Sequence, residues 1–100
     1  MVRHVILWTL KDQYSGAEME EIKAGIKAGL EGLAGKIDGL VAINVYTDGL
    51  ASSNADLMLD STFADEEALK GYAKNPAHVE VADNYVRPYT KSRVCLDFNI

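Results

Sequence analysis

The sequence has one cysteine, two prolines and no long apolar run. With Cys95 as the single cysteine, no disulfide can form within the chain, which fits a reducing compartment such as the cytosol. No segment approaches the ~20 consecutive apolar residues that a membrane-spanning helix needs. The apolar stretch at the start is too short for the core of a signal peptide and lacks a cleavage site. We therefore expect a cytoplasmic protein that does not associate with membranes.

Positive charge is also scarce, because 10 Lys and Arg residues stand against 15 Asp and Glu residues, giving a net charge of −5. No basic run is present, which argues against nucleic acid as a partner. The sequence also lacks a glycine-rich phosphate loop, a G-x-S-x-G motif and any Cys/His spacing typical of zinc sites. We predict neither a cofactor nor a metal ion.

The chain has a size and composition that favour one domain over residues 1–100. Of its 100 residues, 48% are hydrophobic, which is enough for a real core. A domain of this size is only marginally stable alone. Pairing with a second copy would relieve that.

The first predicted strand, over residues 2–10, is apolar on both faces. Val5 and Leu7 alternate on one face, and Ile6 and Trp8 alternate on the other. A strand with this pattern is usually covered on both sides.

A helix is predicted from Ser15 to about Ala34. Ser15 and Glu18 fit the S-x-x-E capping box at its start. Apolar residues then recur at three- and four-residue steps and form one stripe: Met19, Ile22, Ile26, Leu30 and Leu33. Three glycines lie along the flank of this stripe, where each weakens the helix by ~1 kcal/mol relative to Ala: Gly25, Gly29 and Gly32. We expect that the three glycines allow another part of the backbone to pack closely against this helix.

A second strand over residues 40–47 is predicted to place Val41, Ile43 and Val45 on one face, and a third covers residues 56–63.

Asp65 is expected to cap a second helix and Asn75 a third, with Pro76 in its first position and Pro88 at its end. The last strand covers residues 91–98 and includes Cys95, which we expect to be a buried, unreactive thiol.

The order of these elements is βαββααβ, which is typical of the α+β ferredoxin-like fold with an antiparallel sheet and helices on one face. The other face of the sheet would remain apolar and exposed in a monomer. Because such a face marks a partner, we predict a homodimer through the sheet.

Three segments resemble the stress-responsive α/β-barrel domain (Dabb) family: "MVRHVILWTLKD", "NPAHVEVADNY" and the closing "LDF". The resemblance extends over nearly the whole chain. It implies a ferredoxin-like protomer assembled as a dimeric α/β barrel, in agreement with the two-sided strand pattern. Most members of the family have no assigned chemistry.

The resemblance also points to particular residues. Olivetolic acid cyclase, a plant polyketide cyclase of the family, uses a histidine in "PAHV" as base, with a tyrosine six residues earlier. His78 and Tyr72 match these positions, and His4 and Asp83 match further residues of that enzyme. The chain departs from the cyclase at positions that would reshape a pocket: Ile22, Lys23, Asn75, Glu80 and Ala82. The resemblance therefore does not fix a substrate.

His78 would be the third residue of a helix that Asn75 caps. The unpaired amides at a helix start carry partial positive charge, which favours a neutral imidazole. Such an imidazole can accept a proton while the Tyr72 hydroxyl donates a hydrogen bond to a developing oxyanion. The alternative is structural: His78 pins the helix break and Tyr72 belongs to the core.

The resulting hypothesis is a Dabb-type homodimer with a small-molecule pocket near His78 and Tyr72, which takes a small apolar or aromatic ligand. One alternative is a cofactor-free cyclase or aldol-type enzyme with the same two residues as catalytic groups, and another is a purely structural, stress-associated oligomer. The other residues expected to line the pocket are His4, Ile6, Trp8, Ile22, Ile26, Leu59, Val79, Asp83 and Tyr89. For His4, Trp8, Asp83 and Tyr89, a core or surface role is the alternative reading.

Overall fold

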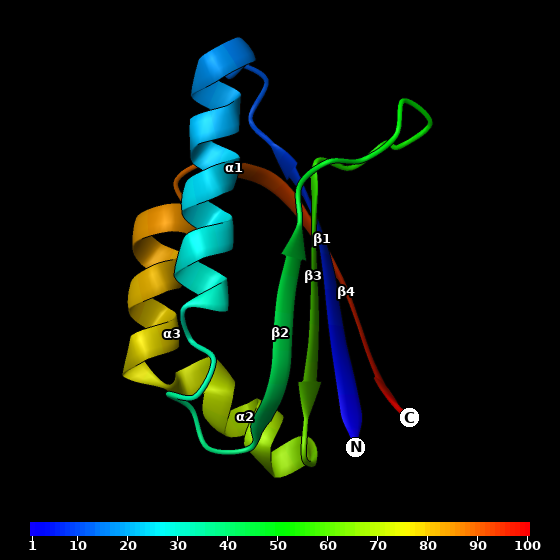
Figure 1. The fold of residues 1–100 in the computed structure, drawn as a ribbon, viewed down its shortest axis with the longest axis vertical. Helices are drawn as coiled ribbons and strands as arrows, with labels where there is room; N and C mark the ends of the chain where they lie inside the picture. Colours follow the sequence, from blue (N-terminus) through cyan, green and yellow to red (C-terminus); the bar gives the residue numbers. More distant parts are fainter.

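The computed structural model describes all residues from 1 to 100 and contains four strands and four helical segments. They are β1 (Val2–Leu10), α1 (Gly16–Glu31), β2 (Leu40–Tyr46), β3 (Leu57–Phe63), α2 (Glu66–Lys74), α3 (Pro76–Val81), η1 (Ala82–Val86) and β4 (Thr90–Asn99). The strands form one antiparallel sheet in the order β2-β3-β1-β4. All helices lie on one side of it (Figure 1). The predicted α+β ferredoxin-like fold is confirmed.

Strand β1 alternates between a buried and a partly exposed face. His4, Ile6 and Trp8 are at most 6% exposed and face the helices, whereas Leu7 on the other face is 40% exposed. Successive side chains of a strand point to opposite faces, so the helices cover only one of the two apolar sets. The other set is uncovered within the protomer.

Helix α1 packs on the sheet through the predicted stripe, with Ile26 and Leu30 fully buried. A Cβ atom built at Gly29 would lie 3.0 Å from Val81 Cγ1 and 3.4 Å from the ring of Tyr85. The glycine therefore permits the close approach of α1 to the α3–η1 segment, which is seen beside it in Figure 1. Close packing is confirmed there.

The predicted capping box at the start of α1 is wrong. Ser15 occupies the N-cap position but makes no side-chain cap hydrogen bond. At the other two helix starts the predicted caps are confirmed: Asp65 Oδ1 accepts from the amide of Ala68 at 2.8 Å, and Asn75 Oδ1 accepts from the amide of Ala77 at 2.9 Å.

Strand β2 is an edge strand that α1 secures through side chains. Val45 donates its amide hydrogen to Glu31 Oε2 at 2.9 Å, and its carbonyl accepts from Lys27 Nζ at 2.7 Å. These contacts satisfy polar backbone groups that an edge strand leaves unpaired. Ile43 and Val45 are buried as expected, but Val41 is 55% exposed because the pairing register shifts between residues 40 and 42. The prediction that Val41 shares one face with Ile43 and Val45 is therefore wrong.

The third helix changes from α-helical to π-helical geometry before it ends. After α3, the segment η1 is a turn of π-helix, in which the Arg87 amide donates to the Ala82 carbonyl at 2.8 Å. Ala82 and Val86 face the interior from this turn. No helix of the protein combines the length and the apolar character needed to cross a bilayer.

Strand β4 pairs with β1 alone and forms the second edge of the sheet. The prediction that Cys95 is buried is wrong, because its thiol is exposed. Alternation correctly assigns Cys95 to the helix side, opposite Ile6 in the register. The helices, however, pack over the other three strands and leave β4 largely uncovered (Figure 1).

The register defines the other side of the sheet, which we call the open face. Its apolar members on β1 and β4 include Val5, Leu7, Val94, Leu96 and Phe98. Val94 and Leu96 are 65% and 64% exposed. Arg3 and Asp60 form the ion pair of this face at 3.5 Å.

Candidate functional site

A cavity of about 740 Å³ lies between the sheet and the second and third helices. Its volume falls in the range of small-molecule sites. Residues from β1, α2, α3, η1 and β4 form its walls, and 11 of the 20 lining residues are hydrophobic. Tyr72 and His78 are both among them.

Tyr72 occupies the inner face of α2 and is 2% exposed. Its ring packs on Phe63, with the centroids 4.9 Å apart, and lies 6.2 Å from the ring of His4. The hydroxyl oxygen is buried and has no hydrogen-bond partner. Burial raises the pKa of Tyr72 to about 12, against a smaller opposing effect of Arg93. The group therefore stays protonated and can serve only as a hydroxyl donor or acceptor.

His78 is the third residue of α3 and is partly buried. Its ring lies 4.1 Å from that of Tyr72, with an angle of 37° between the planes, and its Nδ1 atom is buried without a partner. The pKa of His78 is lowered, mainly by burial, while a hydrogen bond of its ring to the backbone of Ala73 acts in the opposite direction. The direction agrees with the expectation from the sequence. Burial, which we expected to act in the same direction as the helix start, is the largest cause.

His4 lines the cavity from β1 and contacts an acidic residue of β4. Its Nδ1 atom makes a short hydrogen bond or ion pair with Asp97 Oδ1 on β4, its direct partner in the register. Its carbonyl accepts a hydrogen bond from Ser61 Oγ at 3.0 Å. The Nδ1 atom and the carbonyl of this buried residue, which is 6% exposed, therefore both have partners.

Charged side chains also reach the cavity. The lining includes three basic residues, Lys70, Arg87 and Arg93, and two acidic ones, Glu66 and Asp97. Because Arg87 pairs with Asp83, Lys70 and Arg93 remain beside the two acidic residues, and the cavity offers charges of both signs to the polar end of a ligand.

The structure brings together some of the residues that the sequence proposed as a site. The cavity is lined by Tyr72, His78, His4, Ile6, Trp8 and Leu59. Five others lie elsewhere. Ile26 belongs to the closed core, and Val79 is half-buried outside the lining. Asp83 is exposed and pairs with Arg87, and Ile22 and Tyr89 border a separate hollow of about 390 Å³.

Sequence reasoning missed Asp97 and Arg93 as members of the cavity wall. Both lie on the helix side of β4, opposite His4 and Trp8 respectively. The ferredoxin-like strand order, which pairs the first strand with the last, would have indicated them.

The family comparisons place the chain unambiguously. The family model described as the stress-responsive A/B barrel domain (Dabb) matches residues 2–100. No curated protein matches the chain.

Solved structures share the fold over almost the whole chain. A dimeric protein of unknown function with a ferredoxin-like fold from Bacteroides fragilis superposes with a TM-score of 0.91 at 26% identity, covering 99% of this chain and 95% of that one. An Arabidopsis thaliana protein has a TM-score of 0.75 at 26% identity and covers 100% and 95%. The hydroxynitrile lyase from Passiflora edulis has a TM-score of 0.72 at 20% identity, covers 99% and 92%, and resembles this chain in fold alone. With the matched family model and this shared architecture, the chain belongs to the stress-responsive A/B barrel domain (Dabb) family.

Proposed function

We propose that the protein binds a small, partly apolar molecule that carries a hydrogen-bonding oxygen in the cavity beside Tyr72 and His78. The apolar wall of Ile6, Trp8 and Leu59 would hold the body of the ligand. The Tyr72 hydroxyl and the His78 imidazole would form hydrogen bonds with its oxygen.

One observation carries this proposal: two polar atoms in the cavity wall, Tyr72 Oη and His78 Nδ1, are buried without hydrogen-bond partners. A buried unpaired polar group costs about 1–3 kcal/mol, so buried groups of this kind are rare unless something pairs with them. The ring centroids lie 4.1 Å apart, so the two groups are neighbours in the cavity wall. A ligand that pairs with both would remove these penalties.

The binding unit that we propose is a homodimer formed through the open face. Support comes from the exposed apolar residues of that face and from the dimeric state of the similar Bacteroides fragilis protein. The cavity lies on the opposite side of the sheet, so dimerisation through the open face leaves it accessible.

The experiment is an NMR titration with three probes: phenol, benzoate and acetophenone. They share an aromatic ring and differ in the oxygen that they present. Saturable shifts of the Tyr72 and His78 signals are expected. Benzoate should bind more tightly than the other two probes, because its carboxylate is attracted by Lys70 and Arg93. His78→Gln should retain much of the affinity, because the amide still forms hydrogen bonds. If none of the probes saturates the site, the binding proposal fails and the structural-oligomer alternative gains.

A second candidate function is proton abstraction beside a carbonyl without a cofactor. It is favoured by the opposite pKa shifts of the pair, since His78 is kept neutral and Tyr72 is kept protonated. His78 would take the proton from carbon, and the Tyr72 hydroxyl would stabilise the enolate oxygen. Acetophenone tests this directly in D₂O, because its methyl group should exchange hydrogen for deuterium faster with the protein than without it. His78→Gln should abolish the acceleration while binding persists.

A further inference from the structure

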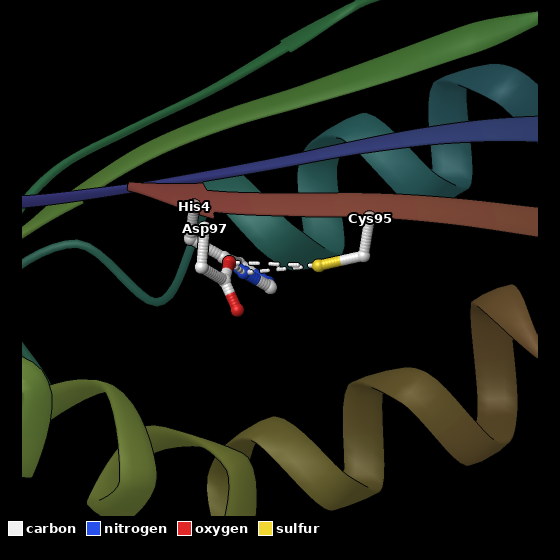
Figure 2. Close-up of side chains that lie close together, drawn as sticks. All are labelled: His4, Cys95 and Asp97. Atoms are coloured by element: carbon white, nitrogen blue, oxygen red, sulfur yellow. Dashed lines mark hydrogen bonds and ion pairs between the residues drawn. The ribbon is translucent and has the colours of Figure 1, made fainter. Parts of the chain in front are cut away.

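Three side chains of different ligand types meet on the helix side of the sheet. The ring of His4 comes from β1, and the thiol of Cys95 and the carboxylate of Asp97 come from β4. One ligand atom from each residue lies within 4.8 Å of the other two. Figure 2 shows the three side chains converging below the two strands, on the side of the sheet that faces the helices.

The antiparallel register creates this cluster. His4 lies directly opposite Asp97, and Cys95 lies two residues before Asp97 and so on the same face. His4 is far from Cys95 and Asp97 in the sequence, so the three residues form no local spacing motif. The sequence-based prediction of no metal ion rested on the absence of such a motif.

The distances suit a tetrahedral metal ion. Cys95 Sγ lies 3.7 Å from His4 Nδ1 and 3.5 Å from Asp97 Oδ1. With a metal–sulfur bond of ~2.3 Å and metal–nitrogen or metal–oxygen bonds of ~2.0–2.2 Å, ligands at a tetrahedral angle stand roughly 3.5 Å apart. The third edge, between His4 Nδ1 and Asp97 Oδ1, is now a short hydrogen bond. A metal ion would take the place of the shared hydrogen and move the exposed carboxylate slightly outward.

The histidine is held in position for this role. Its ring is 6% exposed and packs edge-on against Phe63 at a centroid distance of 6.2 Å and against Tyr72 at the same distance. Orienting contacts around a ligand histidine are a normal part of metal sites. Cys95 and Asp97 are exposed, so an ion can enter from solvent.

We propose that His4, Cys95 and Asp97 form a binding site for a divalent first-row transition metal of the zinc type. Nitrogen, sulfur and a single carboxylate favour such ions over Ca²⁺ and Mg²⁺, which require mainly oxygen ligands. Binding releases the thiol proton of Cys95 to solvent and requires the neutral His4 tautomer with its proton on Nε2, so a proton between Nδ1 and Asp97 must move to Nε2 or to solvent. Three protein ligands leave the fourth position open to water or to a molecule in the adjoining cavity.

One neighbouring charge opposes the site. The guanidinium group of Arg93 acts on Cys95 from the same side of β4. Burial and the neighbouring Asp97 raise the pKa of the Cys95 thiol, while Arg93 lowers it by a smaller amount and repels a cation. Arg93→Gln should therefore alter the affinity without changing the number of ions bound.

The site does not depend on the ligand-binding proposal. His78 is not one of the three ligands, so His78→Gln should leave metal binding intact while it affects the cavity. The open face lies on the other side of the sheet, so dimerisation through it leaves the three ligands uncovered. Failure of either proposal is thus separable from failure of the other.

The test is a Co²⁺ titration of the full chain, free of affinity tag and freshly reduced. Cys95 is the only cysteine, so a sulfur-to-cobalt charge-transfer band can arise only from it. We expect one Co²⁺ per chain and full displacement by Zn²⁺, with no displacement by excess Mg²⁺ or Ca²⁺. Absence of the band, or a band that does not saturate at one ion per chain, would overturn the proposal.

Variants of the exposed ligands make the test specific. Cys95→Ser and Asp97→Asn should each weaken Zn²⁺ binding by more than about tenfold, because even changes to residues that only hydrogen-bond a metal ligand cost that much. Asp12→Asn, which alters another exposed carboxylate, is the matched control and should bind normally. Circular dichroism checks that each variant is folded. Undiminished Zn²⁺ affinity in both ligand variants would refute the site.

The buried histidine needs a test without substitution. In His78→Gln, His4 is the only histidine of the chain, so its imidazole nitrogen signals are unambiguous. Zn²⁺ should shift the Nδ1 resonance of His4 strongly and leave Nε2 protonated. An unchanged His4 signal at saturating Zn²⁺ would exclude His4 as a ligand and end the proposal in this form.

Discussion

The rings of Tyr72 and His78 lie 4.1 Å apart at an angle of 37°, yet no hydrogen bond joins them. The Tyr72 hydroxyl oxygen and the Nδ1 atom of His78 are both left unpaired in the wall of one cavity. Contact between the rings fixes their orientation through packing, and the polar atoms stay available to a third group. This relationship supports the proposed binding site, because polar atoms in a closed core usually pair with each other.

The first prediction concerns Tyr72→Phe. The hydroxyl has no partner, so its removal should leave the free energy of unfolding unchanged or raise it by up to about 1 kcal/mol. Urea denaturation provides the measurement. Tyr46→Phe, which removes the hydroxyl of a residue that is 54% exposed, is the control and should have no effect. A loss of more than about 1 kcal/mol in Tyr72→Phe would mean that the hydroxyl is paired in solution.

The second prediction concerns acid and His78. Its pKa in the folded state is lowered from 6.5 by burial, so below about pH 6.5 the unfolded chain binds more protons than the folded chain. The contribution of His78 to stability is therefore full above pH 6.5 and is lost as the pH falls through the folded pKa. Urea denaturation at about pH 7.5 and about pH 5.5 should show this loss, and His78→Gln should reduce it.

A control separates this effect from the carboxylates. The pKa of Glu31 is lowered from 4.5, chiefly by its hydrogen bond from Lys27, so its contribution is lost only at lower pH. Glu31→Gln should leave the difference between the two pH values intact. Direct NMR titration of His78 gives the second check, and a value at or above ~6.5 would contradict the prediction.

The third prediction concerns the open face. Leu96 is 64% exposed there, and a dimer formed through this face would bury it. Leu96→Glu would place a charge in an apolar interface and should convert the dimer to a monomer, because a buried unpaired charge is strongly unfavourable. Sedimentation at micromolar concentration measures this. Leu50→Glu makes the same change in a loop at a residue that is 79% exposed and should leave the dimer intact. A wild-type monomer would reject the proposed dimer.

The fold was predictable because alternation and capping are local signals. The burial of Ile6 and Trp8 follows from period-two spacing, and the start of α2 follows from Asp65. Ser15 shows the limit of such signals, since its backbone is extended as an N-cap requires but its hydroxyl makes no cap bond. Val41 shows a second limit of local signals, because a register shift separates it from the face that Ile43 and Val45 share.

The site was only partly predictable because its parts come from distant segments. A resemblance could indicate Tyr72 and His78, which lie close together in the sequence. Asp97 joins His4 only through strand pairing between the two ends of the chain. The exposure of Cys95 depends on how far the helices extend over the sheet. The alternation of side chains along β4 carries no information about this extent.

The last prediction compares two helix starts whose N-cap residues, Ser15 and Asp65, are both of types that favour this position. Asp65 accepts a hydrogen bond from the amide of Ala68 at 2.8 Å, whereas Ser15 makes no such bond. Asp65→Ala should therefore lower the free energy of unfolding by about 1 kcal/mol, the usual value of an N-cap side chain, and Ser15→Ala should lower it by clearly less. Urea denaturation of both variants at neutral pH measures the difference. Equal losses would mean that the Ser15 hydroxyl does cap α1 in solution, and the capping box expected from Ser15 and Glu18 would then be restored.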